Sequence, residues 1–355
     1  GLIQCESNFL GIVEKGKNIC VGSGGWKNIT EKYRKAKAYC DDPFEVRHKG
    51  RNKEIIPIRG EWIGDRLNGG QVGRHRIVEI HCENSASVDL PESSLDAVLT
   101  DPPYFGNVQY AELMDFCYVW LRKLIGEKEK PFQHPSTRSQ HELTGNVDMG
   151  RDLEYFTEGI SSVFQRMAKA LKPKAPLAFT YHHNTIEAYF PIAVAILDAG
   201  LVCSASLPCP AEMGASIHIN GTGSSIIDTV FVCRKTGFVS KQSLPCLAAG
   251  VAGLVCQDLA ELRKGNVKPS IGDTRCIAYG HLIRLAIWNL RSTWDNSTNT
   301  SKKLSAVADW LRAFGGWPKV ERHLNELNGT CSQEPLLTVR ENTMDYGVEY
   351  AHVSF

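Results

Sequence analysis

Between residues 76 and 234, short apolar runs alternate with amphipathic stretches, and this alternation limits the chain to few folds. The apolar runs, bounded by turn residues, predict strands at 76–82, 95–100, 176–181, 201–207 and 226–234. The amphipathic stretches predict helices at 110–125, 153–171 and 185–198. Strands that alternate with helices form a largely parallel sheet with helices on both faces, so the predicted fold class is α/β. Only a Gly/Ser-rich loop joins the last two strands, so we expect them to pair antiparallel at one edge.

The segments before and after this region do not show the same alternation of strands and helices. Residues 1–60 contain twelve lysines and arginines against seven aspartates and glutamates, and one helix is predicted at 29–39 between short strands. After residue 236 the signals are helical, with helices predicted at 257–264, 281–290 and 304–314. We therefore expect three parts, namely a basic accessory segment over 1–70, an α/β core over 71–238 and a helical region over 239–355.

Composition narrows the class of protein further. The chain has 355 residues, of which 43% are hydrophobic, so a substantial core is expected. Its 40 basic and 39 acidic residues leave a net charge of +1, so contacts with nucleic acid must be local. No apolar run approaches the about 20 residues of a membrane span. Twelve cysteines at irregular spacings, without a Cys-x-x-Cys pair, favour reduced thiols, no metal site and a cytoplasmic protein.

The residues that carry chemistry form a stiff turn directly after the apolar strand at 95–100. The turn reads Asp101-Pro102-Pro103-Tyr104-Phe105, and we call residues 101–105 the proline corner. The carboxyl ends of strands are where ligands bind in open α/β sheets. Two successive prolines fix the backbone and remove two amide hydrogens, so the carbonyl groups there remain free to accept hydrogen bonds. A plain strand-ending turn is the alternative interpretation of these residues.

A carboxylate, a carbonyl and an aromatic ring in rigid succession suit the binding of a planar base through its exocyclic amine. If Asp101 and the Pro102 carbonyl accept the two amine hydrogens, the nitrogen lone pair is directed at an incoming electrophile such as a sulfonium methyl group. The base must be flipped out of a duplex to reach such a site. Tyr104 would then supply a stacking surface that Phe105 extends.

Here the sequence resembles a known family. It looks like the amino-methyltransferases of DNA, whose Asp-Pro-Pro-Tyr motif follows a strand of an S-adenosylmethionine (AdoMet)-dependent, Rossmann-like methyltransferase sheet. More narrowly, it is similar to the large adenine-specific DNA methylases that carry an extra N-terminal domain and are associated with restriction-modification and anti-phage defence. The residues that carry this resemblance lie at 99–121, 179–183 and 228–235.

The resemblance implies roles for particular residues. Asp101, Pro102, Pro103 and Tyr104 would handle the target amine, and the residues implied to contact the base are Tyr104, Phe105 and His182. Glu83, Asn84 and Ser85 would contact AdoMet, although a polar turn is the alternative for them. DNA is the implied substrate, and the basic residues expected to contact it lie between Lys27 and Arg59, together with Arg122, Lys123, Lys128, Lys130 and Arg138. The polar loop at 126–152 is a candidate lid over the base.

One departure from the family pattern concerns the cofactor loop. The expected Phe-x-Gly-x-Gly turn is absent upstream of residue 76, and the Gly-rich stretch at 20–25 is a poor substitute. We therefore expect an incomplete sheet and a chain that forms the C-terminal part of a longer enzyme. Its other partners would be an N-terminal portion of that enzyme or further defence-system subunits.

Several alternatives to adenine N6 methylation remain at this point. The motif chemistry does not separate adenine N6 from cytosine N4, because both are exocyclic amines. RNA and a protein glutamine amide also present a planar NH2 group. A protein of another class is also compatible, namely a catalytically silent nucleic-acid-binding fragment or subunit that keeps the sheet.

Overall fold

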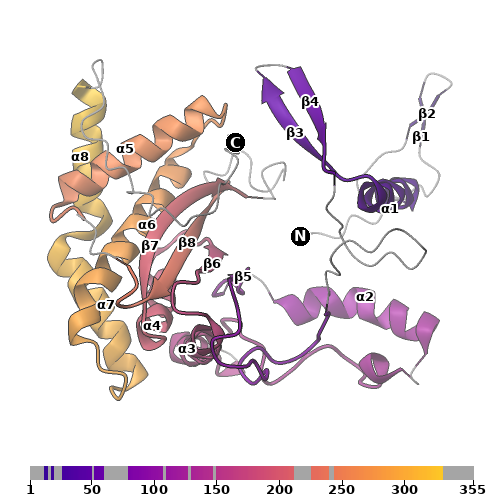
Figure 1. The fold of residues 1–355 in the computed structure, drawn as a ribbon, viewed down its shortest axis with the longest axis horizontal. Coiled ribbons are helices and arrows are strands. Elements are labelled where there is room, and N and C mark those ends of the chain that lie inside the picture. The colour runs from indigo at the N-terminus through magenta and orange to yellow at the C-terminus, as the bar shows by residue number, and fades with distance from the viewer. Residues whose placement is uncertain are drawn as a thin grey trace. The chain divides into compact units, whose positions relative to one another are not determined.

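The computed structural model (Figure 1) describes residues 12–14, 17–19, 26–49, 52–59, 79–106, 109–126, 129–146, 149–211, 225–239 and 244–330. These residues belong to two units, and each is described here by itself. The described part of the first unit lies between residues 12 and 82, and the second unit covers residues 83–346.

The described part of the first unit contains two antiparallel hairpins and one helix. The hairpins pair β1 (Ile12–Glu14) with β2 (Lys17–Ile19) and β3 (Phe44–Lys49) with β4 (Asn52–Pro57). Helix α1 (Trp26–Asp41) confirms the predicted helix at 29–39, and its side chains from Thr30 onward are exposed or half-buried. The strand predicted at 76–82 is wrong over residues 79–82, which are irregular and exposed, and residues 76–78 lie outside the described ranges.

A mixed four-stranded sheet organises the second unit. It consists of β5 (Val98–Thr100), β6 (Leu177–Tyr181), β7 (Leu201–Pro210) and β8 (Ile227–Lys235), in the order β5-β6-β8-β7. Strands β5 and β6 are parallel, whereas β8 is antiparallel to both of its neighbours. The predicted antiparallel pairing of the last two strands is confirmed, but of these two only β7 lies at an edge. The prediction of a largely parallel sheet is wrong among the described strands, because only β5 and β6 pair in parallel.

The helices of this unit follow the predicted pattern with several extensions. The structure contains α2 (Tyr110–Ile125), α3 (Leu153–Ala170), the short η3 (Ile186–Tyr189), α4 (Phe190–Asp198), α5 (Ala248–Lys264), α6 (Ile271–Leu290), α7 (Thr300–Phe314) and α8 (Gly316–Thr330). Helices α5 and α6 begin nine and ten residues earlier than predicted, and α8 was not predicted. None of the described helices has both the length and the apolar character that a membrane span requires.

Helices cover one face of the sheet. On that face Val98, Leu177 and Cys233 lie side by side across three strands and are buried. The Phe179 ring, next along β6, contacts Phe164 of α3, with ring centroids 5.0 Å apart. Figure 1 shows α5 to α8 on one side of β7 and β8.

The opposite face is much less covered. Its residues Ala178, Thr180, Val230 and Val232 are half-buried, and Leu99 of β5 is 79% exposed. The predicted cover of both faces is therefore not found over the described residues of β5, β6 and β8, whereas Val202 and Ala205 of β7, on this same face, are buried. Strand β5 is also less buried than the sequence indicated.

Helix α2 has the predicted bounds but not the predicted environment. Of its residues only Ala111 is buried, and the apolar stripe predicted to face a core is largely exposed at Trp120, Leu121 and Leu124. The helix is held instead by polar contacts with the following loop, described below. The amphipathic pattern therefore predicted the helix correctly, but no described element covers its apolar surface.

A close approach between α6 and the sheet gives a test of this packing. A Cβ atom on Gly280 would lie 2.4 Å from Ser206 Oγ and 2.8 Å from Thr229 Cγ2. We expect Gly280→Ala to lower the free energy of unfolding by about 1–3 kcal/mol in urea titrations, because the helix must move away from the sheet. The control is Gly253→Ala in α5, where a Cβ meets nothing within 4 Å. That variant should be neutral or more stable, since alanine favours helix, and equal losses in both variants would contradict the close approach.

Candidate functional site

The proline corner lies at the carboxyl end of β5, where the sequence places it. Asp101 is exposed and Pro102 is buried, so the corner is anchored by its first proline while its carboxylate faces outward. Asp101 Oδ1 accepts a hydrogen bond of 2.5 Å from Thr180 Oγ1. The other oxygen, Oδ2, has no hydrogen-bond partner among the described residues. The carboxylate is therefore oriented by β6 and keeps one oxygen available to a ligand.

Tyr104 lies half-buried beside this carboxylate. Its ring meets that of Tyr181 edge-on, with centroids 5.4 Å apart and an interplanar angle of 74°. Burial raises the pKa of the Tyr104 phenol well above its usual range, the carboxylates of Asp228 and Asp101 raise it further, and a hydrogen bond with Thr180 opposes both. The phenol is consequently a neutral group at physiological pH.

Phe105 has a different environment from the one the sequence suggested. Its ring packs edge-on against Phe156 of α3, with centroids 5.3 Å apart, and its backbone N–H lies 3.5 Å from the Tyr181 hydroxyl. This ring therefore anchors the corner to the covered side of the sheet. The Tyr181 hydroxyl itself donates a hydrogen bond of 2.9 Å to the carbonyl of Ala188.

Two histidines follow β6, and the structure separates them. His182 Nδ1 lies 3.4 Å from the thiol of Cys276 in α6, away from the corner. His183 Nδ1 accepts from the Thr185 N–H at 3.1 Å, and its ring also interacts with the backbone of Phe105. Burial lowers the pKa of both imidazoles, so both are neutral near pH 7. His183, rather than the predicted His182, adjoins the proline corner.

The residues implied to contact AdoMet form a turn on the surface. Glu83, Asn84 and Ser85 are exposed, and the residues directly before them, 79–82, form no strand. The Asn84 side-chain oxygen accepts from the Ala86 N–H at 3.0 Å, and its carbonyl accepts from Ser87 and Val88. The Asn84 side chain therefore stabilises its own turn, which agrees with the alternative interpretation of these residues as a polar turn. The other candidate, the Gly-rich stretch at 20–25, lies outside the described residues.

The polar loop after α2 is confirmed as a loop, but it is fastened to that helix. Glu142 accepts from the Ala111 N–H at 2.9 Å and pairs with the buried Arg151 at 3.1 Å. Asp115 accepts from the Thr137 N–H at 2.6 Å and from its hydroxyl at 2.7 Å, and these bonds, with one from Ser136, lower the pKa of its carboxyl group. Two carboxylates therefore fix the loop in place, and its predicted role as a lid stays a prediction.

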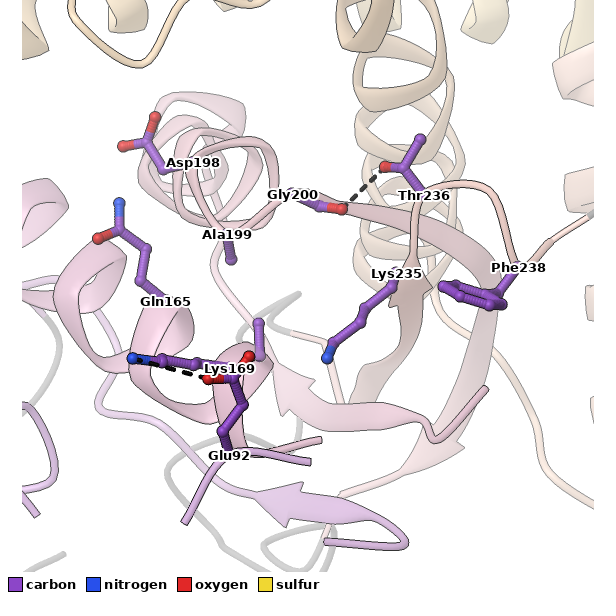
Figure 2. Close-up of a pocket in the computed structure, with 10 residues that line it drawn as sticks. Glu92, Gln165, Lys169, Asp198, Ala199, Gly200, Lys235, Thr236 and Phe238 are labelled. Atoms are coloured by element: carbon purple, nitrogen blue, oxygen red, sulfur yellow. Dashed lines mark hydrogen bonds and ion pairs between the residues drawn. The ribbon is translucent and has the colours of Figure 1, made fainter. Parts of the chain in front are cut away.

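Two surface hollows lie away from the corner. The first, of about 470 Å³, is at the opposite end of the sheet, where β7 begins and β8 ends (Figure 2). Lys235 there donates a hydrogen bond of 2.6 Å to the carbonyl of Leu171, while Lys169 lies 4.0 Å from Glu92. The second, of about 500 Å³, lies between α2 and the following loop. Neither hollow is lined by a residue of the proline corner.

Thr180, Tyr181 and Asp228 are site residues to which the sequence analysis assigned no role. They come from β6 and β8, which the alternating pattern predicted as strands without specifying their neighbours. One sequence signal could have identified Thr180. It is a polar residue between two aromatic residues, and in a strand the side chains on either side of it point to the opposite face, toward the core. Its proximity to Asp101 follows only from the pairing of β5 with β6.

Fold and site together define a mixed α/β protein with a polar corner at the carboxyl end of two parallel strands. No protein family, no curated protein and no solved structure matches the chain. The geometry of the corner is therefore the main indication of what this protein does.

Proposed function

We propose that this protein takes part in AdoMet-dependent methyl transfer to the exocyclic amine of a flipped DNA base, with adenine N6 as the target. The observation that carries the proposal is the Asp101 carboxylate. It is exposed, fixed by Thr180 and adjacent to the neutral phenol of Tyr104. The preference for adenine over cytosine, and a role in restriction-modification or anti-phage defence, come from the family resemblance.

The arrangement of the sheet is compatible with this proposal. The corner follows one parallel strand and contacts the next, which is the position where open α/β sheets bind ligands. We therefore interpret the sheet as part of a Rossmann-like methyltransferase sheet. The described cysteines are free thiols, which fits the cytoplasm, where DNA is accessible.

The described residues account for the amine side of such a reaction. Asp101 Oδ2 would accept one amine hydrogen, and a carbonyl of the corner would accept the other. These two contacts localise the nitrogen lone pair and direct it away from the ring. Tyr104, as a neutral ring, would stack on the base or bound its edge. No strong base is needed, because the amine loses its proton only after it has gained the methyl group and a positive charge.

Neither the turn at residues 83–85 nor the two hollows described above forms a binding site for AdoMet beside the corner. Asn84 is engaged within its own turn, and neither of the two hollows reaches the corner. We propose that the methyl donor is held by segments outside the described ranges or by a separate polypeptide. Among the described residues no strand pairs with the outer edge of β5, and Leu99 beside it is exposed, so a strand and a helix of a separate polypeptide could be added there.

The direct test is to express the chain in cells whose DNA lacks methylated bases and to digest that DNA to nucleosides. We expect N6-methyladenine in the mass spectrum when the wild-type chain is expressed with any segment it requires. Its absence, with the protein folded and DNA bound, would contradict the proposal. That outcome would support the second candidate, a non-catalytic nucleic-acid-binding subunit.

Thr180 provides a test of positioning. Thr180→Val removes the hydroxyl that orients Asp101 but keeps the shape of the side chain. We expect kcat to fall by about 10- to 100-fold with little change in KM for DNA, because a hydrogen bond to a charged group contributes about 1.5–3 kcal/mol. Thr180→Ser restores the hydroxyl and should recover most of the rate. Equal rates for the valine and serine variants would exclude this role for the hydroxyl.

A further inference from the structure

The hollow beside α2 belongs to a loop that touches the proline corner at one end. This loop, residues 129–146, lines the hollow with residues 134 and 136–141, and Tyr118 of α2 completes the wall. At its far end, a Cβ on Gly145 would lie 2.8 Å from both Gly106 N and Phe105 Cε2. The loop is thus in contact with the corner, while the hollow lies outside it.

Side chains of the two flanking helical segments hold the backbone of this loop. Four of its carbonyl groups accept hydrogen bonds, namely those of Phe132 from Arg122 (2.8 Å), His134 from Tyr118 (2.6 Å), Ser139 from Arg151 (2.7 Å) and Gln140 from Tyr155 (2.8 Å). The donors belong to α2, to α3 and to the residue just before the α3 N-cap. The backbone conformation is therefore set before any ligand binds, which lowers the entropic cost of binding.

The side chains around the hollow are mostly hydrogen-bond donors. Arg138 is 62% exposed, and His134, Ser139, Gln140 and His141 are also exposed. The nearby carboxylates are largely engaged within the protein, since Asp115 accepts from Ser136 and Thr137 and Glu142 accepts from Arg151. Arg138 lies 3.7 Å from Asp115 and 3.8 Å from Glu112, distances at which an exposed ion pair is weak.

Further basic residues lie close to this loop in the chain. Arg122 and Lys123 lie in the last turn of α2, and Lys130 begins the short helix η1 (Lys130–Phe132). At the hollow itself, the fixed backbone and the exposed guanidinium and imidazole groups are features that position a phosphate backbone without reading its sequence.

We propose that the hollow lined by His134, Arg138 and His141 binds phosphate groups of the DNA backbone. This inference rests on the proposed function, because DNA is the substrate assigned there. We further infer that the outer side of this loop, whose backbone conformation is already fixed, positions the duplex. The other end of the loop, at Gly145, contacts the corner.

The test measures DNA affinity by fluorescence anisotropy with a labelled duplex oligonucleotide, on the full chain and without AdoMet. Arg138→Ala should weaken binding by about tenfold and lower the slope of log K against log salt by about one. Arg138→Lys keeps the charge and should retain most of the affinity. The matched control is Lys169→Ala, since Lys169 is another exposed cation but lies at the opposite end of the sheet. Circular dichroism would verify that each variant is folded.

Several outcomes would overturn this inference. They are an unchanged affinity and salt slope in Arg138→Ala, an equal loss in Lys169→Ala, no binding of the duplex by the wild-type chain, and tighter binding of an RNA duplex of the same sequence. Failure of the proposed function is a separate outcome. If Arg138→Ala weakens DNA binding but the wild-type chain forms no methylated base, the phosphate site is supported and the proposed methyl transfer is contradicted.

Discussion

Replacement of Asp101 by asparagine is expected to lower the rate of methyl transfer by about 10²–10³-fold. The substitution keeps the size of the side chain but removes the negative charge that accepts an amine hydrogen. Losing one preorganised electrostatic contact at a reacting centre typically has an effect of that size. The measurement is the initial rate of radiolabel transfer from AdoMet to DNA, with any required donor-binding segment present.

The matched control for this variant is Asp96→Asn. Asp96 is also an exposed aspartate close to β5, but it pairs with Lys172 at 2.5 Å and is not part of the corner. We expect Asp96→Asn to retain wild-type activity and Asp101→Asn to retain wild-type affinity for DNA. A rate for Asp101→Asn within twofold of the wild type would remove the basis of the proposed function.

The second large effect is expected in the core, at Phe179. This ring is 2% exposed and lies between Phe164 and Phe231, with centroids 5.0 Å and 5.3 Å away. Phe179→Ala should lower the free energy of unfolding by about 3–5 kcal/mol, because it removes buried surface and leaves a cavity. Denaturant titrations followed by circular dichroism would measure this loss.

The control for the core prediction tests the one-sided packing of the sheet. Leu99→Ala lies on the neighbouring strand β5 but on the exposed face, so its cost should be within about 0.5 kcal/mol. If Phe179→Ala leaves too little stability to measure, Phe179→Leu should give a graded loss of roughly 1–2 kcal/mol. Similar losses for Leu99→Ala and Phe179→Ala would mean that both faces of the sheet are covered.

Local structure could be predicted well where a signal is repeated along the chain. Helix α2 has the predicted bounds, and α3, β6 and β8 differ from their predicted bounds by a residue at one or both ends. Helices α5 and α6 were predicted too short because apolar residues surround much of their circumference, so the one-sided periodicity of a surface helix is weak there. The predicted strand at 76–82 failed over residues 79–82 because a short apolar run does not determine whether a partner strand lies beside it.

For the candidate site, the sequence predicted the reactive residues but not their neighbours. The proline corner is identifiable from five consecutive residues after an apolar strand. Thr180 lies 79 positions further along the chain, and its hydrogen bond to Asp101 depends on β5 and β6 being adjacent and parallel. His182 and His183 are equivalent candidates in the sequence, because both follow the same strand, and only the structure shows that His183 interacts with the backbone of Phe105.

The sequence by itself determined the α/β class, most helices and strands, and the stiff corner that carries the carboxylate, because each of these depends on residues close together in the chain. Tertiary structure alone decided that β8 inserts between β6 and β7, that the described helices cover mainly one face, and that Thr180 orients Asp101. These features depend on which distant segments pair, and pairing is governed by the burial of side chains from all of the strands together.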